Sequence, residues 1–125
     1  MKIAHLSAEC MPFAKTGGLG DVAAALPRAQ AAAGHEVEVW LPFHLPAAQW
    51  YRQRKSWPEL GCEPLVLDIM GQSYQVGILR GQLPASQVPV YFVACDPFFH
   101  RGPIYALDHD GNDDGLWRFA LFVRA

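Results

Sequence analysis

A lysine followed at once by a cluster of glycines is the part of this sequence best suited to chemistry. Lys15 precedes Thr16, and then Gly17, Gly18 and Gly20 stand at the start of an apolar, alanine-rich stretch. Backbone N–H groups at the start of a helix can hold an anion, and glycines let that anion approach closely. Lys15 adds a full positive charge. The segment therefore predicts a site for a phosphate or a pyrophosphate.

The spacing differs from the two best-known phosphate-binding motifs. A P-loop places its lysine after the last glycine of G-x-x-x-x-G-K, whereas Lys15 precedes the glycines. The dinucleotide-binding fingerprint requires G-x-G-x-x-G, which Gly17, Gly18 and Gly20 do not match. From the residues alone, a glycine turn with a solvated lysine is an open alternative to an anion site.

The order of the predicted elements gives this segment a ligand-binding position. Residues 2–8 alternate as a strand, residues 9–16 form a loop, and a helix follows from about Leu19. A second strand is expected from Val37 to Leu41. Strand, glycine loop, helix and strand in this order make a βαβ unit, which predicts an α/β fold with a Rossmann-like parallel sheet. Ligands of such sheets bind beyond the carboxyl ends of the strands.

The predicted first helix has one apolar face but contains a proline. The apolar face comprises Leu19, Val22, Ala23, Leu26 and Ala33. Because an interior proline costs about 3 kcal/mol, Pro27 should kink this helix or divide it into two short ones. Gly34 is a suitable C-terminal cap.

After the second strand, the sequence predicts a short loop, a helix, three strands, a long loop and a final helix. The expected ranges are a loop at 42–46, a helix at 47–57, a hairpin of strands 65–70 and 74–79 around Gly71, a buried strand at 87–94, a loop at 95–112 and a helix at 113–125. His44, between two prolines, is expected on the surface.

Composition limits the class of protein. The 125 residues are 51% hydrophobic and 18% charged, as in a folded domain rather than a disordered chain. Ten Lys and Arg against twelve Asp and Glu give a net charge of −2, which argues against nucleic acid or membrane as a partner. No apolar run approaches the ~18 residues of a membrane helix.

The cysteines and acidic residues predict neither disulfides nor a metal. Three cysteines without a C-x-x-C pair favour reduced, buried thiols in a cytoplasm. The acidic cluster of Asp108, Asp110, Asp113 and Asp114 lacks the spacing and the terminal Glu of an EF-hand. We therefore expect no metal and no other cofactor.

Several stretches resemble one enzyme family. The segment Glu9–Val22 reads E-C-M-P-F-A-K-T-G-G-L-G-D-V, with Ala-Leu-Pro at 25–27, and is similar to the N-terminal signature of bacterial glycogen synthases and plant starch synthases. Residues 34–42, 91–105 and 118–122 also resemble that family. The chain departs from it by one inserted residue in Ser7-Ala8-Glu9, by the loss of a basic residue at 42–44, and around residues 112–117.

The resemblance implies a GT-B glycosyltransferase, in which two Rossmann-like domains face each other across a cleft. Such an enzyme transfers glucose from ADP-glucose to the non-reducing 4-hydroxyl of an α-1,4-glucan such as glycogen, with retention and without a metal. Cationic side chains and backbone amides stabilise the leaving diphosphate. This chain would then be a partial N-terminal domain without its C-terminal GT-B domain, and is expected to be inactive alone.

The resemblance also implies roles for single residues. The substrate-binding residues would be Lys15, Thr16, Gly17 and Gly18. Asp21 would lie near the glucosyl unit and the acceptor, and Glu9 would orient Lys15 or a sugar hydroxyl, so both are expected to be catalytic. Two alternatives stay open: Asp21 could only cap the helix or complement its dipole, and Glu9 could be a loop carboxylate without a ligand.

Two other functions remain as alternatives. One is a non-catalytic Rossmann-like module that binds glucan or phosphate, and it differs from the enzyme only in lacking the rest of the active site. The other is a different GT-B enzyme or sugar-phosphate binder, which is disfavoured because the glycine loop occurs together with Asp96–Tyr105. In that second loop, His100, Arg101 and Tyr105 are either ligand-side residues or ordinary turn residues. The sequence leaves ADP-glucose versus UDP-glucose and the oligomeric state open.

Overall fold

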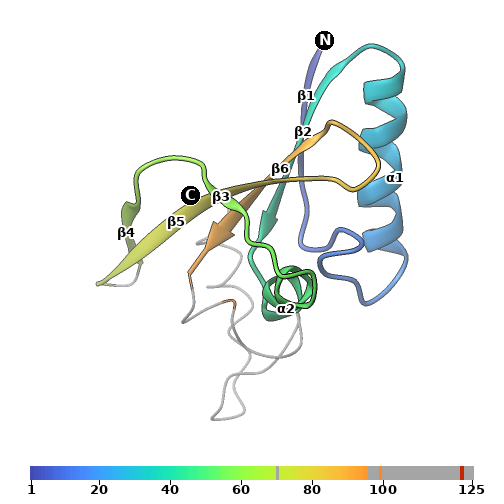
Figure 1. Ribbon diagram of the computed structural model, residues 1–125. Helices are drawn as coiled ribbons and strands as arrows, with labels where there is room; N and C mark the ends of the chain where they lie inside the picture. The colour runs from blue at the N-terminus through green and yellow to red at the C-terminus, as the bar shows by residue number, and fades with distance from the viewer. Residues whose placement is uncertain (70, 96–98, 100–121, 123–125) are drawn as a thin grey trace.

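In the part of the chain that it describes, the computed structural model has a mixed sheet and the two helices α1 and α2 (Figure 1). It describes residues 1–69, 71–95, 99 and 122. The elements in chain order are β1 (Lys2–Leu6), α1 (Gly18–Ala32), β2 (Glu36–Pro42), α2 (Leu45–Gln53), β3 (Glu59–Leu60), β4 (Leu65–Ile69), β5 (Gln72–Gln82) and β6 (Pro89–Ala94).

The sheet is parallel in one half and antiparallel in the other. Its order is β1-β2-β6-β5-β3, with β4 also paired to β5. β1 and β6 both run parallel to β2, as the βαβ unit predicts, and Ile3 lies opposite Val37. β5 is antiparallel to its neighbours. The expected α/β fold is confirmed, but the sheet is not parallel throughout, because β5 and β6 are joined by residues 83–88 alone, which suits an antiparallel pair.

Helix α1 is one uninterrupted helix, so the alternative of two short helices divided at Pro27 is wrong. Pro27 has no N–H to donate to the carbonyl of Ala23, four residues earlier. The Cys10 thiol lies 3.6 Å from that carbonyl oxygen and donates to it instead. A side chain from the preceding loop therefore satisfies the carbonyl that the proline leaves without its helical donor.

The buried face of α1 is also different from the predicted one. Gly20, Ala23, Ala24 and Pro27 are buried, whereas the larger apolar residues Leu19, Val22 and Leu26 are 51%, 58% and 44% exposed. Small side chains let the helix axis come close to β2, and hydrophobic periodicity does not reveal that preference. The predicted cap is confirmed, since Gly34 has a φ of +95° directly after the helix.

Helix α2 begins and ends earlier than predicted. Pro46 lies in its first turn, where a missing N–H has no cost. Lys55, with a φ of 52°, follows its end. Only residues 43–44 separate β2 from α2. Both helices pack on the same side of the sheet, around a core of Val39, Leu41, Val90, Phe92 and Tyr51.

The second half of the sheet contains the predicted hairpin. β4 and β5 pair antiparallel around Gly71, whose φ is +77°. β5 continues to Gln82, which is further than predicted, and β3 was not expected. A second cluster that includes Ile78 and Val93 covers the other face of the sheet. The predicted loop at 95–112 and helix at 113–125 lie almost entirely outside the described residues.

The cysteines divide into two kinds. Cys10 and Cys95 are buried as predicted, but Cys62 is exposed, because it lies in the connection between β3 and β4 and has no core to enter. Among the described residues, no helix has the length and apolar character that crossing a bilayer requires.

Candidate functional site

The segment between β1 and α1 forms a folded loop at the carboxyl end of β1 (Figure 1). Its first residue donates from Ser7 N–H to the Trp40 carbonyl of β2 at 3.0 Å, and Met11 N–H donates to the Gly20 carbonyl of α1 at 3.0 Å. These two bonds tie the loop to both neighbouring elements. It therefore lies at the sheet edge where parallel α/β folds bind ligands.

Phe13 anchors the middle of the loop in the core. Its side chain is 1% exposed. Its ring centroid lies 4.9 Å from that of Trp50, 5.1 Å from that of Phe92 and 5.8 Å from that of Tyr51. The pairs with Trp50 and Phe92 are edge-to-face and the pair with Tyr51 is stacked, and both arrangements contribute beyond the area they bury. The loop position is thus fixed by α2 and β6 as well as by its own ends.

Cys10 supports the loop but is not a nucleophile. Its backbone exchanges hydrogen bonds of 2.9 and 3.0 Å with Ala14, which closes a tight turn over residues 10–14. Burial raises the pKa of the Cys10 thiol to about 11, although Arg28 acts weakly in the other direction. The thiol therefore stays protonated at neutral pH and acts as a donor to Ala23.

Glu9 lies under the glycine loop and is only 4% exposed. Its Oε1 accepts hydrogen bonds from the N–H of Thr16 at 2.7 Å and of Gly17 at 3.3 Å. The prediction was that Glu9 orients Lys15 or a sugar hydroxyl, but the structure turns its carboxylate to the loop backbone. The N–H groups of Thr16 and Gly17, which were expected to bind the substrate, therefore already have an acceptor within the protein.

Lys15 and Asp21 form an ion pair on the open side of the loop. The Lys15 Nζ lies 2.9 Å from Asp21 Oδ1, and the two side chains are 42% and 49% exposed. An exposed pair of this kind contributes about 1 kcal/mol at most, so a ligand anion can replace the carboxylate at little cost. Asp21 lies in the first turn of α1, where its charge complements the helix dipole, while the N-cap is Gly17 without a side-chain cap.

The glycines leave room beside this ion pair. A Cβ added to Gly17 or Gly18 would meet no atom within 4 Å, whereas one on Gly20 would lie 3.0 Å from Lys15 Cγ. The N–H groups of residues 18–20 have no acceptor four residues earlier in the helix. A positive side chain, the N–H groups of the exposed residues Gly18 and Leu19, and open space thus meet at one point, which can hold a phosphate.

We expect Gly18→Ala to weaken ligand binding without weakening the fold. The added methyl group enters the open space that a phosphate would occupy, so the affinity for inorganic pyrophosphate should fall about 10-fold, or about 1.4 kcal/mol. The free energy of unfolding should stay within about 0.5 kcal/mol. Calorimetric titration and urea denaturation measure the two quantities. Gly77→Ala, where the new Cβ meets only Ala94 at 3.9 Å, is the matched control.

His44 is buried, contrary to the expected surface position, and it contacts the loop. Its side chain is 1% exposed, and its Nε2 lies 2.9 Å from the Ala8 carbonyl oxygen. The ring also packs edge-to-face on Phe99 at 5.8 Å. The sequence carried one signal for this contact: His44 follows a strand parallel to β1, so it emerges at the same edge of the sheet as Ala8.

Other predicted candidates fall outside the structure. His100, Arg101, Tyr105 and the acidic cluster from Asp108 to Asp114 lie outside the described residues. Within the described ranges, His, Cys, Asp and Glu side chains form no group of three that could hold a metal ion.

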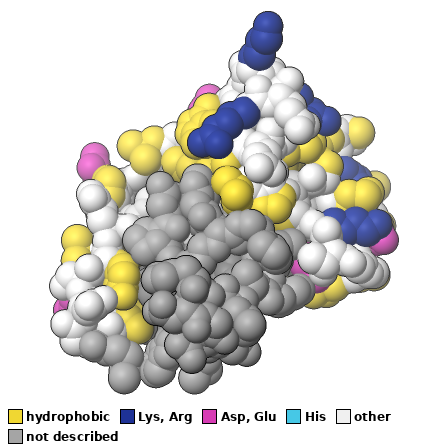
Figure 2. All heavy atoms as spheres, turned by 90° about the horizontal axis from the view of Figure 1, so that it is seen from below, with side chains coloured by type: hydrophobic (Ala, Val, Ile, Leu, Met, Phe, Trp, Pro, Cys, Tyr) yellow, Lys and Arg dark blue, Asp and Glu magenta, His cyan; other side chains and the backbone are white. Residues whose placement is uncertain are grey.

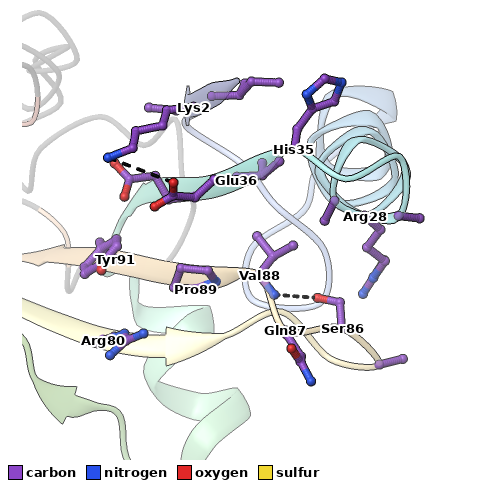
Figure 3. Close-up of a pocket in the computed structure, with 17 residues that line it drawn as sticks. Lys2, Arg28, His35, Glu36, Arg80, Ser86, Gln87, Val88, Pro89 and Tyr91 are labelled. Atoms are coloured by element: carbon purple, nitrogen blue, oxygen red, sulfur yellow. Dashed lines mark hydrogen bonds and ion pairs between the residues drawn. The ribbon is translucent and has the colours of Figure 1, made fainter.

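A hollow lies at the opposite end of the parallel strands (Figure 3). It is lined by the first residues of β1, β2 and β6 and by the last turns of α1. Arg28 donates from its guanidinium to the Pro84 carbonyl at 2.9 and 3.1 Å, and Lys2 lies 3.9 Å from the Glu36 carboxylate. This hollow contains none of the predicted site residues.

Figure 2 shows the molecule from below relative to Figure 1, that is, from the side where α2 lies. Lys and Arg side chains in this view are interleaved with hydrophobic and other side chains. The candidate site rests on one lysine, Lys15, and on the start of α1.

Fold and loop together define an α/β protein with a glycine loop between its first strand and its first helix. The chain belongs to the family of the starch synthase catalytic domain, whose family model matches residues 2–125. It is 34% identical to glycogen synthase 1 of Geobacter metallireducens over 126 residues, and 39% identical to the glycogen synthase of Paramagnetospirillum magneticum over 123 residues. These matches cover 100% and 97% of this chain, but 24% of each relative.

A solved structure shows the same relationship. The catalytic domain of starch synthase IV from Arabidopsis thaliana, bound to ADP and acarbose, superposes with a TM-score of 0.67 at 30% sequence identity. The match covers 98% of this chain and 23% of that domain. The resemblance inferred from the motifs is confirmed, and the chain spans about a quarter of the length of these relatives.

Proposed function

We propose that this chain supplies the phosphate-binding side of a glycogen synthase active site. The reaction is transfer of glucose from ADP-glucose to the non-reducing end of an α-1,4-glucan, with retention of configuration. The observation that carries the proposal is the position of Lys15 beside the open N-terminus of α1, in a chain whose family is that of starch synthases. The related structure bound to ADP and acarbose supports a nucleotide and a glucan as ligands.

The proposed chemistry assigns the positive groups to the leaving diphosphate. The bond from glucose C1 to the diphosphate oxygen breaks, a bond from C1 to the acceptor 4-oxygen forms, and the acceptor hydroxyl proton is released. Negative charge grows on the departing ADP, where the Lys15 ammonium and the N–H groups of Gly18 and Leu19 stabilise it. These groups bind the charge that develops in the transition state, so they accelerate the transfer as well as binding the donor.

Asp21 is the acidic residue that we place near the reacting sugar. Its carboxylate is 49% exposed on the open side of the loop, so it can reach a ligand once Lys15 turns to the phosphate. Thr16 and Gly17 lie along the rim of the same site, with their N–H groups bonded to Glu9. We propose no metal ion or other cofactor, since the lysine and the helix start supply the positive charge.

We also propose a cytoplasmic location and a larger active site. The thiols of Cys10 and Cys62 form no disulfide, which suits a reducing compartment. The relatives are about four times as long as this chain, and a second Rossmann-like domain of the GT-B type would close the site over the loop.

A transfer assay tests the proposed function. The full-length protein is incubated with ADP-glucose labelled with ¹⁴C in the sugar, together with glycogen, and the label in precipitated glycogen is counted. Incorporation that depends on both substrates supports the proposal. Binding of ADP without any incorporation would instead indicate the non-catalytic binding module.

The 125-residue chain alone should transfer no glucose above background. It contains the residues proposed to bind the phosphates, but the groups that would bind the rest of the nucleotide and the acceptor lie outside the described loop. The same labelled assay, run with an equal molar amount of the full-length protein as the positive control, measures this directly. Robust turnover by the short chain would show that the site is complete within it.

A further inference from the structure

We propose that Glu9 is a positioning residue that holds the glycine loop in its ligand-binding shape and does not itself touch the substrate. This inference rests on the proposed function, because it concerns the same site. It assigns a structural cause to a residue that the motif alone would make catalytic.

The first argument is the geometry of the carboxylate. One oxygen of Glu9 accepts from two successive backbone N–H groups, those of Thr16 and Gly17, across a loop of seven residues. Hydrogen bonds to an ionised acceptor are about twice as strong as neutral ones. Two such bonds to adjacent peptides fix the orientation of the chain as it enters α1.

The second argument is which helix N–H groups remain for a ligand. A helix leaves four N–H groups without an internal acceptor at its start, here those of residues 17–20. Glu9 accepts from the first of these, Gly17, and so fixes the start of the helix. The N–H groups of the exposed residues Gly18 and Leu19 then stand in a defined direction beside Lys15, ready for a phosphate.

The third argument is that neighbouring residues fix the position of Glu9 itself. Its side chain is 4% exposed, and its own N–H and C=O bond to the Ser7 hydroxyl at 3.3 and 2.6 Å. The carbonyl of the preceding Ala8 is 2.9 Å from the buried His44 Nε2. His44, which follows β2, thus fixes the peptide next to Glu9. A buried carboxylate held in this way can order the loop before the ligand binds.

Preorganisation gives the expected effect its direction. A loop that is already ordered loses less conformational entropy when the ligand binds. Without Glu9, the loop must be ordered by the ligand itself, which weakens binding of the donor. Replacement of Glu9 should therefore act on the affinity for ADP and on the KM for ADP-glucose more than on kcat.

The test uses Glu9→Ala and Glu9→Gln in the full-length protein, beside Lys15→Ala. Hydrogen exchange of peptides that cover residues 9–20 reports loop order, and calorimetric titration with ADP reports affinity. We expect Glu9→Ala to speed exchange in the loop and to weaken ADP binding about 10-fold. Glu9→Gln, which keeps an acceptor oxygen, should restore part of both. Glu36→Gln, an exposed carboxylate at the far end of β2, is the matched control.

Different results overturn the inference and the proposed function separately. If Lys15→Ala abolishes ADP binding while Glu9→Ala changes neither loop exchange nor affinity, Glu9 does not position the loop, although the site stands. If Glu9→Ala weakens ADP binding with loop exchange unchanged, or if both Glu9 variants lower kcat alone, Glu9 acts on the substrate directly. If ADP binding survives Lys15→Ala as well, the phosphate site itself is wrong.

Discussion

Replacement of Lys15 with alanine should lower kcat/KM for ADP-glucose about 100-fold in the full-length protein, which is the usual cost of removing one group that stabilises developing negative charge. Among the described loop residues 7–17, Lys15 is the one with a positively charged side chain, and it pairs with Asp21 at the start of α1. Within the described loop, its loss leaves helix N–H groups alone to face the departing diphosphate. Initial rates of glucose transfer at varied ADP-glucose measure the effect.

The fold should tolerate this change, which separates the effect on activity from one on stability. The ion pair with Asp21 is half exposed, so its loss costs about 1 kcal/mol of unfolding free energy at most. Lys2→Ala is the matched control: it removes an exposed lysine at the other end of β1, also near a carboxylate. Equal kinetics for Lys15→Ala, Lys2→Ala and the unchanged protein would remove Lys15 from the site.

The largest expected effect on stability is that of Phe13→Ala, at about 3–5 kcal/mol of unfolding free energy. The Phe13 ring is buried among the rings of Trp50, Tyr51 and Phe92, which come from two other elements. Its removal leaves a cavity at the junction of loop, α2 and β6. Urea denaturation followed by tryptophan fluorescence measures the change, and Trp50 at 4.9 Å provides a local signal.

A second residue of the same loop tests whether the effect is specific to burial. Met11 is 38% exposed, and Met11→Ala should change the unfolding free energy by about 0.5 kcal/mol or less. Phe13→Leu, which keeps an apolar side chain in the cavity, should cost less than Phe13→Ala. If Phe13→Ala and Met11→Ala unfold at the same urea concentration, the aromatic cluster does not hold the loop.

The parts of the fold that the sequence predicted well are those decided by neighbouring residues. The alternation in residues 2–8, the glycines at 17–20 and the turn at Gly71 each constrain the backbone over a few positions. The helix start and the turn lie where they were expected, and β1 lies within the predicted range but ends at Leu6. The glycine loop and its lysine were located in the same way. A motif of adjacent residues needs no knowledge of the rest of the chain.

The predictions that were wrong depended on partners far away in the sequence. Pro27 does not break α1 because the Cys10 thiol donates to the carbonyl that the proline leaves, a contact across 13 residues. The buried face of α1 consists of small residues because β2 lies close to it, although the larger Leu26 fitted the periodicity better. His44 is buried because β1 and β2 end at the same edge of the sheet.

The candidate site shows the same division. By itself, the sequence determined that a lysine and three glycines stand between a strand and a helix, since residue types and spacing fix that local chemistry. Only the tertiary structure decided that Lys15 pairs with Asp21 on the open side while Glu9 turns inward to the Thr16 and Gly17 backbone. The physical reason is that the folded loop, held by Phe13 and His44, sets which carboxylate is buried, and a buried carboxylate needs the backbone N–H groups that lie within its reach.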